Sequence, residues 1–222
     1  MYKTLDYDIQ KSFIPVALLA SVPQVLVVNP NRVSARNLKD FIALMKKNPG
    51  KYNFASAGSG TVHHLAGELF KIQTGTFIVH IPYRGGSPAI TDTIGGQVPL
   101  VAVNALEVLP HAKSGKLKVL AVLSPNRSAN FPEAPTIAES GYPGFEASVW
   151  YGLVAPAATP KTIVTRLHAE VQKALQTREV RERMTAVGGE VVPATADQFG
   201  ALIRSERLRY EKLVRDAQIK PD

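Results

Sequence analysis

Two short loops rich in glycine and serine hold the residues of this chain that are best suited to binding chemistry. The first loop consists of Ser56, Ala57, Gly58, Ser59, Gly60 and Thr61, and the second consists of Tyr83, Arg84, Gly85, Gly86 and Ser87. Glycine has no Cβ, so the backbone of each loop can approach a ligand closely. Each loop leads into a predicted helix, whose free N–H groups and dipole favour negative charge. The loops therefore predict an anion site, and a small carboxylate suits it.

The residues alone leave a simpler interpretation open. Many turns between strands and helices are rich in small residues for steric reasons, and Ser59 or Thr61 could simply cap the next helix. In the second loop, Ser87 followed by Pro88 predicts an N-cap with proline at the first helical position. Arg84 could hold a carboxylate through two hydrogen bonds or could face solvent.

Residues that could support catalysis or metal binding are not arranged for either. Ser59 lies between two glycines but lacks the Gly-x-Ser-x-Gly pattern of hydrolases. His63 and His64 are adjacent, so on a helix they point about 100° apart and cannot chelate together. The chain has no cysteine, which excludes disulfides and cysteine-ligated metals. We therefore predict no catalytic residue, no metal site and no cofactor.

Strands and helices alternate in the first part of the chain, and this order positions the loops. Short apolar runs predict strands at 24–28, 52–56, 77–81, 98–103 and 118–122. Helices are predicted between them at 35–47, 61–74, 88–94 and 105–113. This alternation predicts an α/β lobe with a mostly parallel sheet, whose ligands bind beyond the carboxyl ends of the strands. Both loops lie there, as does Asn104.

The second part of the chain predicts a different kind of unit. A connector spans 123–144, and a strand with the only tryptophan follows at 145–156. Helices are predicted at 160–177, 178–187 and 195–217, with one short strand at 190–192. These helices need an apolar partner surface, and a lobe built from residues 145–222 alone would be short of sheet.

Composition and charge exclude several classes of protein. The 222 residues are 45% hydrophobic and 20% charged, which is typical of a globular protein. No apolar run reaches the roughly 18–20 residues of a membrane span, and the first residues lack the layout of a signal peptide. The net charge is +8, but the last predicted helices mix both signs at helical spacing. We therefore predict a solvated helical face and no nucleic-acid partner.

Several longer segments carry a resemblance to a known family. They read SFIPVALLA at 12–20, PGKYNFASAGSGT at 49–61, HLAGELF at 64–70, HIPYRGGSPA at 80–89 and GLVAP at 152–156. In this order, and over nearly the whole chain, they resemble the Bug-type solute-binding proteins of tripartite tricarboxylate transporters. The resemblance implies a protein that captures a small organic carboxylate in the periplasm and passes it to a membrane permease without chemistry. The carboxylate would be a di- or tricarboxylate or an aromatic acid.

The resemblance also implies a fold and its division. The fold would be α/β and type II periplasmic-binding-protein-like, with one complete parallel-sheet lobe and the C-terminal part of a second lobe. Residues 1–22 would be a crossover and the start of the lobe-one remnant, 23–144 the complete lobe two, and 145–222 a crossover strand and the C-terminal helices of lobe one. Ligand contacts would come from all residues of both loops, 56–61 and 83–87, and from Asn104.

The chain departs from the family pattern in ways that matter for its role. Relatives begin with a signal peptide and a further part of lobe one, and neither has a counterpart here. An incomplete lobe would expose sheet edge and apolar surface, which leaves open a homodimer through that lobe. Val103 stands where relatives that bind amino acids often have Asp, which argues against an amino-acid ligand. The alternative function is a truncated relative that acts as a dimeric interaction or sensory module.

Overall fold

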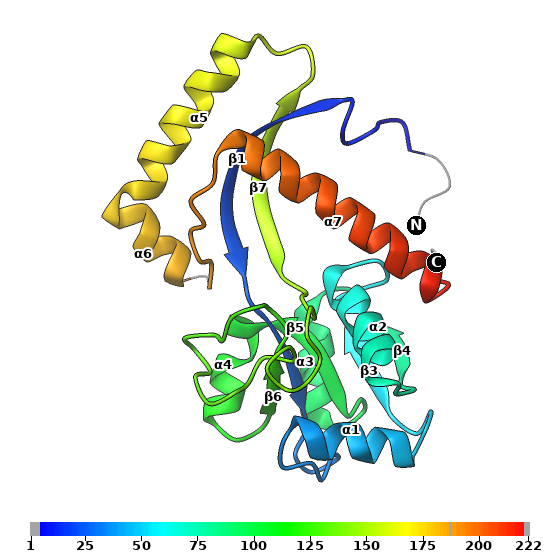
Figure 1. Ribbon diagram of the computed structural model, residues 1–222. Coiled ribbons are helices and arrows are strands. Elements are labelled where there is room, and N and C mark those ends of the chain that lie inside the picture. Colours follow the sequence, from blue (N-terminus) through cyan, green and yellow to red (C-terminus); the bar gives the residue numbers. More distant parts are fainter. Residues whose placement is uncertain (1–4, 187, 220–222) are drawn as a thin grey trace. The chain divides into compact units, whose positions relative to one another are not determined.

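The chain divides into two compact units. The computed structural model describes residues 5–186 and 188–219. Unit 1 combines the described residues up to Val22 with Val149–Arg215, and unit 2 combines Pro23–Ser148 with the described residues after Arg215 (Figure 1). Among the described residues, no helix is both long enough and apolar enough to cross a membrane.

Unit 2 is built on a five-stranded sheet in the order β4-β3-β5-β2-β6. The strands are β2 (Gln24–Val28), β3 (Asn53–Ser56), β4 (Val79–Pro82), β5 (Leu100–Asn104) and β6 (Lys118–Val122). β3 is parallel to β4 and β5, whereas β2 is antiparallel to β5 and β6. The predicted α/β class is confirmed, but the sheet is mixed and not wholly parallel. A buried apolar strand such as β2 has the same pattern in either direction, so its sequence could not reveal this.

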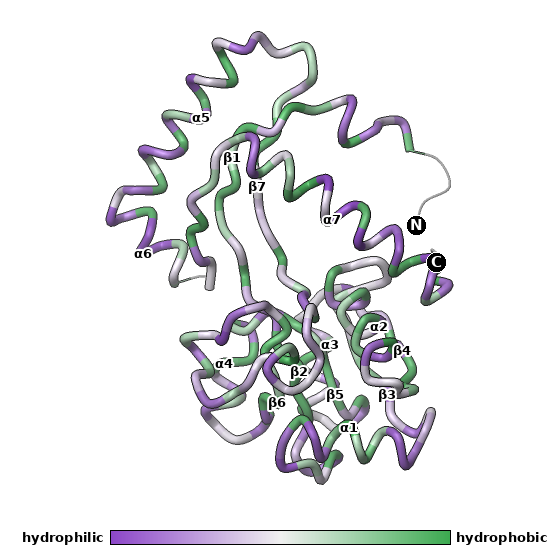
Figure 2. The backbone as a smooth tube through the Cα atoms, viewed as in Figure 1, coloured by the Kyte–Doolittle hydropathy of each residue, from purple (hydrophilic) through white to green (hydrophobic). Residues whose placement is uncertain are grey.

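The strands β2, β3 and β5 of unit 2 are buried on both faces, as their apolar runs predict, whereas the edge strand β4 is partly exposed. Because side chains alternate across a strand, Leu26 and Val28 belong to one core cluster, and Val25 and Val27 belong to the other. The first cluster includes residues of α1 (Leu38–Lys47) and α2 (Val62–Thr74), and the second includes residues of α3 (Gly86–Gly95) and α4 (Ala105–Lys113). Figure 2 shows the mostly hydrophobic character of β2 and β5.

Two helices of unit 2, α1 and α3, begin more than one residue away from their predicted starts. α1 is capped by Asn37, whose side chain accepts a hydrogen bond from the Asp40 backbone N–H at 2.8 Å, so the helix begins later than predicted. α3 begins at Gly86 with Gly85 at its N-cap, so the prediction that Ser87 is the cap is wrong. Gly85 has φ +116°, a conformation that favours glycine, and it turns the chain before Ser87 is reached.

Unit 1 contains a two-stranded antiparallel sheet, β1 (Phe13–Val22) with β7 (Val149–Pro156). Its helices are α5 (Lys161–Gln176), α6 (Arg178–Ala186) and the part of α7 (Ala196–Asp216) that ends at Arg215. Trp150 of β7 packs edge-to-face against Phe199 of α7, with 5.6 Å between ring centroids.

The two strands predicted in the second part of the chain differ from the structure. The strand expected at 145–156 begins only at Val149, since Phe145 and Ala147 belong to the core of unit 2. The strand expected at 190–192 is wrong, because Glu190 forms only an isolated bridge with Ser21. Pro193 follows directly and cannot donate to a ladder. Val187, the last residue of a predicted helix, lies outside the described residues.

Candidate functional site

The two predicted loops are joined to each other by backbone hydrogen bonds. The N–H of Tyr83 donates to the carbonyl of Ser56 at 3.0 Å, and the N–H of Gly85 donates to the carbonyl of Ala57 at 3.1 Å. Gly58 approaches so closely that an added Cβ would lie 3.3 Å from the Tyr83 carbonyl oxygen, and its φ is +137°. The loops after β3 and β4 therefore form one continuous backbone surface in unit 2.

Side chains of the first loop largely stabilise the loop itself. The Thr61 hydroxyl donates to the Gly58 carbonyl at 2.7 Å and accepts from the His64 N–H at 3.4 Å, so Thr61 caps α2. Ser56 is fully buried, and its Oγ accepts from the Gly58 N–H at 3.1 Å. Ser59 is half-buried and forms no hydrogen bond with another described residue. Its hydroxyl and the N–H groups of Val62 and His63, the first two of α2, are therefore available to an anion.

The second loop is held through Tyr83. Its hydroxyl donates to Oδ2 of Asp92 in α3 at 2.9 Å. Burial, and then the neighbouring Asp92 carboxylate, raise the pKa of Tyr83 to about 12. Arg84 and Ser87 are exposed. The loop thus combines a fixed aromatic side chain with one exposed cation beside the start of α3.

Asn104 is engaged within the protein. Its side chain accepts from Nε2 of Gln24 at 2.7 Å and donates to Oε1 of Glu107. The Glu107 carboxylate lies against Gly86, where an added Cβ would collide with Oε2. An acidic side chain of α4 therefore already lies beside the start of α3, one of the two predicted anion positions.

His63 completes this polar group from the start of α2. It is 8% exposed, and neither ring nitrogen has a hydrogen-bond partner among the described residues. Burial lowers the pKa of His63, although the Glu107 carboxylate and the Asn104 side chain act in the opposite direction. The lowered pKa favours the neutral form of His63 at the place where α2 and α4 begin. The starts of α2, α3 and α4 thus share one polar cluster.

The roles of Gln24, His63 and Glu107 were not predicted from the sequence. Glu107 had a signal, because Asn104 followed three residues later by Glu is the pattern of a helix N-terminal box. His63 was considered only as a metal ligand. Within the described residues, no group of three or more acidic, histidine or cysteine side chains could hold a metal ion.

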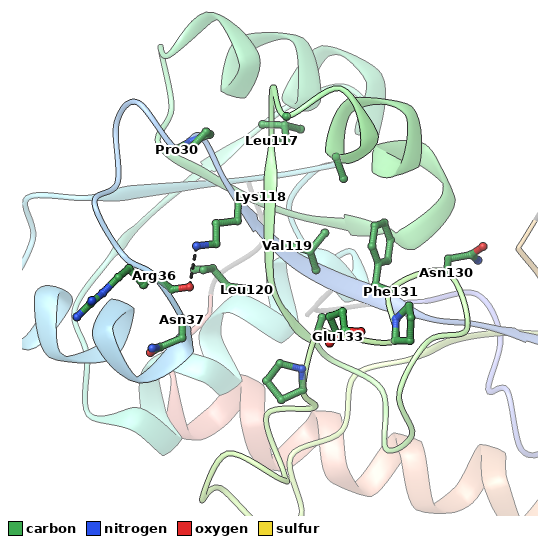
Figure 3. Close-up of a pocket in the computed structure, with 15 residues that line it drawn as sticks. Pro30, Arg36, Asn37, Leu117, Lys118, Val119, Leu120, Asn130, Phe131 and Glu133 are labelled. Carbon is green, nitrogen blue, oxygen red and sulfur yellow. Dashed lines mark hydrogen bonds between the residues drawn. The ribbon is translucent and has the colours of Figure 1, made fainter.

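Unit 2 also has a cavity that lies away from the two loops. It has a volume of about 680 Å³ and is bordered by β6, the start of α1 and the segment around Phe131 (Figure 3). Nζ of Lys118 donates to the Arg36 carbonyl at 2.7 Å on its wall. None of the predicted site residues lines this cavity. Its size therefore does not make it the candidate site, whose features are the joined loops and the helix starts.

Comparison with known proteins gives the relatives of this chain. The family model "Tripartite tricarboxylate transporter family receptor" matches residues 1–219. Protein BugT of Bordetella pertussis is 40% identical over 217 residues, which are 98% of this chain and 66% of BugT. The chain spans about two thirds of the length of the curated relatives that it matches.

Two solved structures with ligands in their names are also similar. R. palustris Rpa4515 with adipate is 31% identical with a TM-score of 0.85, covering 100% of this chain and 74% of that chain. MatC from Rhodopseudomonas palustris with bound malate is 30% identical with a TM-score of 0.81, covering 96% of this chain and 73% of that chain. The resemblance of the sequence to this family and the expected fold class are thereby confirmed.

Proposed function

Because this chain belongs to the tripartite tricarboxylate transporter receptor family, we propose that it captures a small organic carboxylate in the periplasm and passes it to a membrane permease. The family is one of periplasmic, non-enzymatic solute-binding proteins. The observation that carries the proposal is the direct joining of the two predicted loops at the starts of α2 and α3.

We propose that the two units correspond to two lobes of such a protein. Unit 2 would be the complete lobe, predicted at 23–144, and unit 1 would contain the predicted segments 1–22 and 145–222 of the other lobe. Neither the described residues nor the matched relatives support the homodimer that the sequence left open. The homodimer and the interaction-module alternative therefore form no part of the proposal.

The charged end of the ligand is proposed to bind at the start of α2. There, the first N–H groups of the helix and the Ser59 hydroxyl would donate to a carboxylate. Glu107 would repel a second negative charge placed against Gly86, so the start of α3 is the less favourable of the two positions. Arg84 would add an exposed cation at the edge of the site.

The other predicted residues take supporting positions in this proposal. Ser56 and Thr61 fix the shape of the first loop, and Asn104 orients Glu107. The backbone of the remaining residues would form the surface against the ligand: Ala57, Gly58, Gly60, Tyr83, Gly85, Gly86 and Ser87.

We propose a di- or tricarboxylate or an aromatic acid as the ligand. Adipate and malate, the ligands named for two similar structures, are both dicarboxylates. The site offers helix N–H groups for one carboxylate and a single exposed arginine nearby, which suits an acid that has at least one fully ionised carboxyl group near neutral pH.

Calorimetric titration with adipate, malate, citrate and benzoate tests the proposal. We expect saturable binding of at least one acid, weakened about three- to tenfold by Arg84→Gln. Lys47→Gln removes the same charge from the exposed end of α1 and serves as the matched control. Failure of all four acids to bind, or equal losses in both variants, would contradict the proposal.

A further inference from the structure

Two histidines on neighbouring elements of unit 2 are stacked beneath the first loop. The rings of His64 on α2 and His80 on β4 lie 3.7 Å apart between centroids and only 6° from parallel. The His80 ring also packs against Phe54, at 4.9 Å. Neither histidine has a part in the proposed ligand contacts, yet each is bonded to the loop that would make them.

His64 holds the loop through a backbone donor. The N–H of Gly60 donates to Nδ1 of His64 at 3.1 Å. Since a backbone N–H can only donate, Nδ1 must be unprotonated, and the ring proton lies on Nε2. Nε2 is 3.8 Å from Oε1 of Glu68, which fits that tautomer.

His80 holds the same loop at its beginning. Its Nε2 and the Ser56 hydroxyl lie 2.6 Å apart, and the same hydroxyl oxygen accepts from the Gly58 N–H. The two imidazoles thus fix both sides of the turn at Gly58, one through Ser56 and one through Gly60.

From this geometry we propose that His64 and His80 are positioning residues, which hold the loop in its binding conformation only while His64 is neutral. The carboxylate affinity of the protein then falls on acidification. This inference rests on the proposed function, because it assumes that the loop 56–61 binds the carboxylate.

Protonation of His64 removes the acceptor on which Gly60 depends. Nδ1–H⁺ would face the Gly60 N–H, so two donors would meet and the hydrogen bond would be lost. A second protonation, at His80, would place two like charges in rings that are 3.7 Å apart. The stack therefore tolerates at most one imidazolium, and the loop loses an anchor when that one is His64.

The charged groups around the pair do not cancel this effect. Glu68 faces His64 and favours its protonation, but Nζ of Lys71 lies 2.9 and 2.8 Å from the two oxygens of the same carboxylate and offsets much of its charge. A cavity of about 320 Å³ lies beside the pair. Its lining consists of the two histidines with Glu68 and Lys71, of Ser59 and Pro82, and of the apolar residues Ala217 and Ile219. Through this cavity, solvent protons can reach the pair.

The first arm of the test measures affinity against pH. Calorimetric titration of the full chain with adipate and with malate at about pH 7.5 and about pH 5.5 is expected to show a loss of about tenfold at the lower pH, as one hydrogen bond is lost. In His64→Asn, the Asn oxygen keeps an acceptor near the position of Nδ1 but cannot be protonated. We expect this variant to show a smaller loss of affinity between the two pH values than the wild type.

His111→Asn, a histidine of α4 outside the stack, is the matched control and should keep the pH dependence of the wild type. An affinity that rises on acidification would overturn the inference, because a merely attractive imidazolium would then dominate. Equal pH dependence in the wild type and His64→Asn would also overturn it.

The second arm needs no ligand. An NMR pH titration of the wild-type chain should show the Gly60 amide signal moving with the same midpoint as the His64 ring. An amide signal that ignores the His64 titration would overturn the inference. If the amide follows His64 but no acid binds at the higher pH, the loop anchor stands and the proposed function has failed instead.

Discussion

The two units of the chain differ in how much of their helices they bury. In unit 2, eight of the thirteen residues of α2 are buried, whereas in unit 1 only two of the sixteen residues of α5 and none of α6 are buried. β7 of unit 1 leaves Tyr151 53% exposed and Leu153 38% exposed. The helix that follows the first loop is therefore packed into a core that can hold a precise loop geometry, whereas α5 and α6 are mostly exposed.

The largest expected loss of stability comes from a substitution in the buried core of unit 2. Phe54 of β3 is fully buried, and its ring packs against Gly67 of α2 and against the His80 ring. We expect Phe54→Ala to lower the free energy of unfolding by about 3–5 kcal/mol. Urea denaturation measures the loss. Leu208→Ala, at a side chain of α7 that is 65% exposed, should change stability by less than about 0.5 kcal/mol. Similar losses in both variants would remove the contrast between the units.

A smaller effect separates stability from binding. An alanine Cβ at Gly67 of α2 would collide with the Phe54 ring, and one at Gly152 of β7 would collide with the Phe199 ring. Both substitutions should destabilise by about 1–3 kcal/mol, because the rings must move. We expect only Gly67→Ala to weaken carboxylate binding, since Phe54 supports His80 and the first loop. Calorimetric titration of both variants decides this, and weaker binding in Gly152→Ala alone would contradict it.

The N-caps of α2 and α7 form a matched pair whose loss is expected to have a smaller effect on stability. Thr61 caps α2 in unit 2, and the Thr195 hydroxyl accepts from the Gln198 N–H at 3.1 Å at the start of α7. Each Thr→Ala change should cost about 1 kcal/mol of stability. Thermal unfolding tests that equality. Thr61→Ala should also reduce ligand affinity because its hydroxyl holds Gly58, whereas Thr195→Ala should leave affinity unchanged. Unchanged ligand affinity in both variants would contradict the role of the first loop in binding.

The smallest expected effect concerns the pH dependence of stability. The pKa of Tyr83 is raised to about 12 from the usual 10.0 of a tyrosine, so the folded state holds this proton more tightly than the unfolded state. The stabilisation is complete below about pH 10 and is lost as the pH rises towards about 12. We therefore expect the stability advantage of the wild type over Tyr83→Phe to shrink between about pH 9 and about pH 11.5. Urea denaturation at both pH values checks this, and a constant difference would contradict the raised pKa of Tyr83 that burial and Asp92 produce.

Much of unit 2 could be predicted from its sequence because its elements are short, apolar and ended by glycine. β2, β6 and α4 have the predicted bounds, and Thr61 caps α2 as one interpretation allowed. The antiparallel direction of β2 was not predictable, since its burial on both faces carries no direction. Ser87 was mistaken for a cap because the positive φ of Gly85 depends on pairing with the first loop.

The polar contacts around the loops were less accessible to sequence reasoning. His64 and His80 are sixteen positions apart in the chain, and their stacking requires α2 to pack against β4. The placement of Glu107 against Gly86 likewise depends on how α3 and α4 lie in the same unit. Local patterns identify loops and caps, but such contacts between elements require the fold.

The most direct test of the central claim is a map of amide chemical shifts in the full chain on addition of adipate or malate. If the joined loops bind the carboxylate, the largest changes will fall on Ser59–His63 and on the loop from Tyr83 to Ser87. Saturable changes confined to the cavity around Phe131, or to unit 1 alone, would contradict the account.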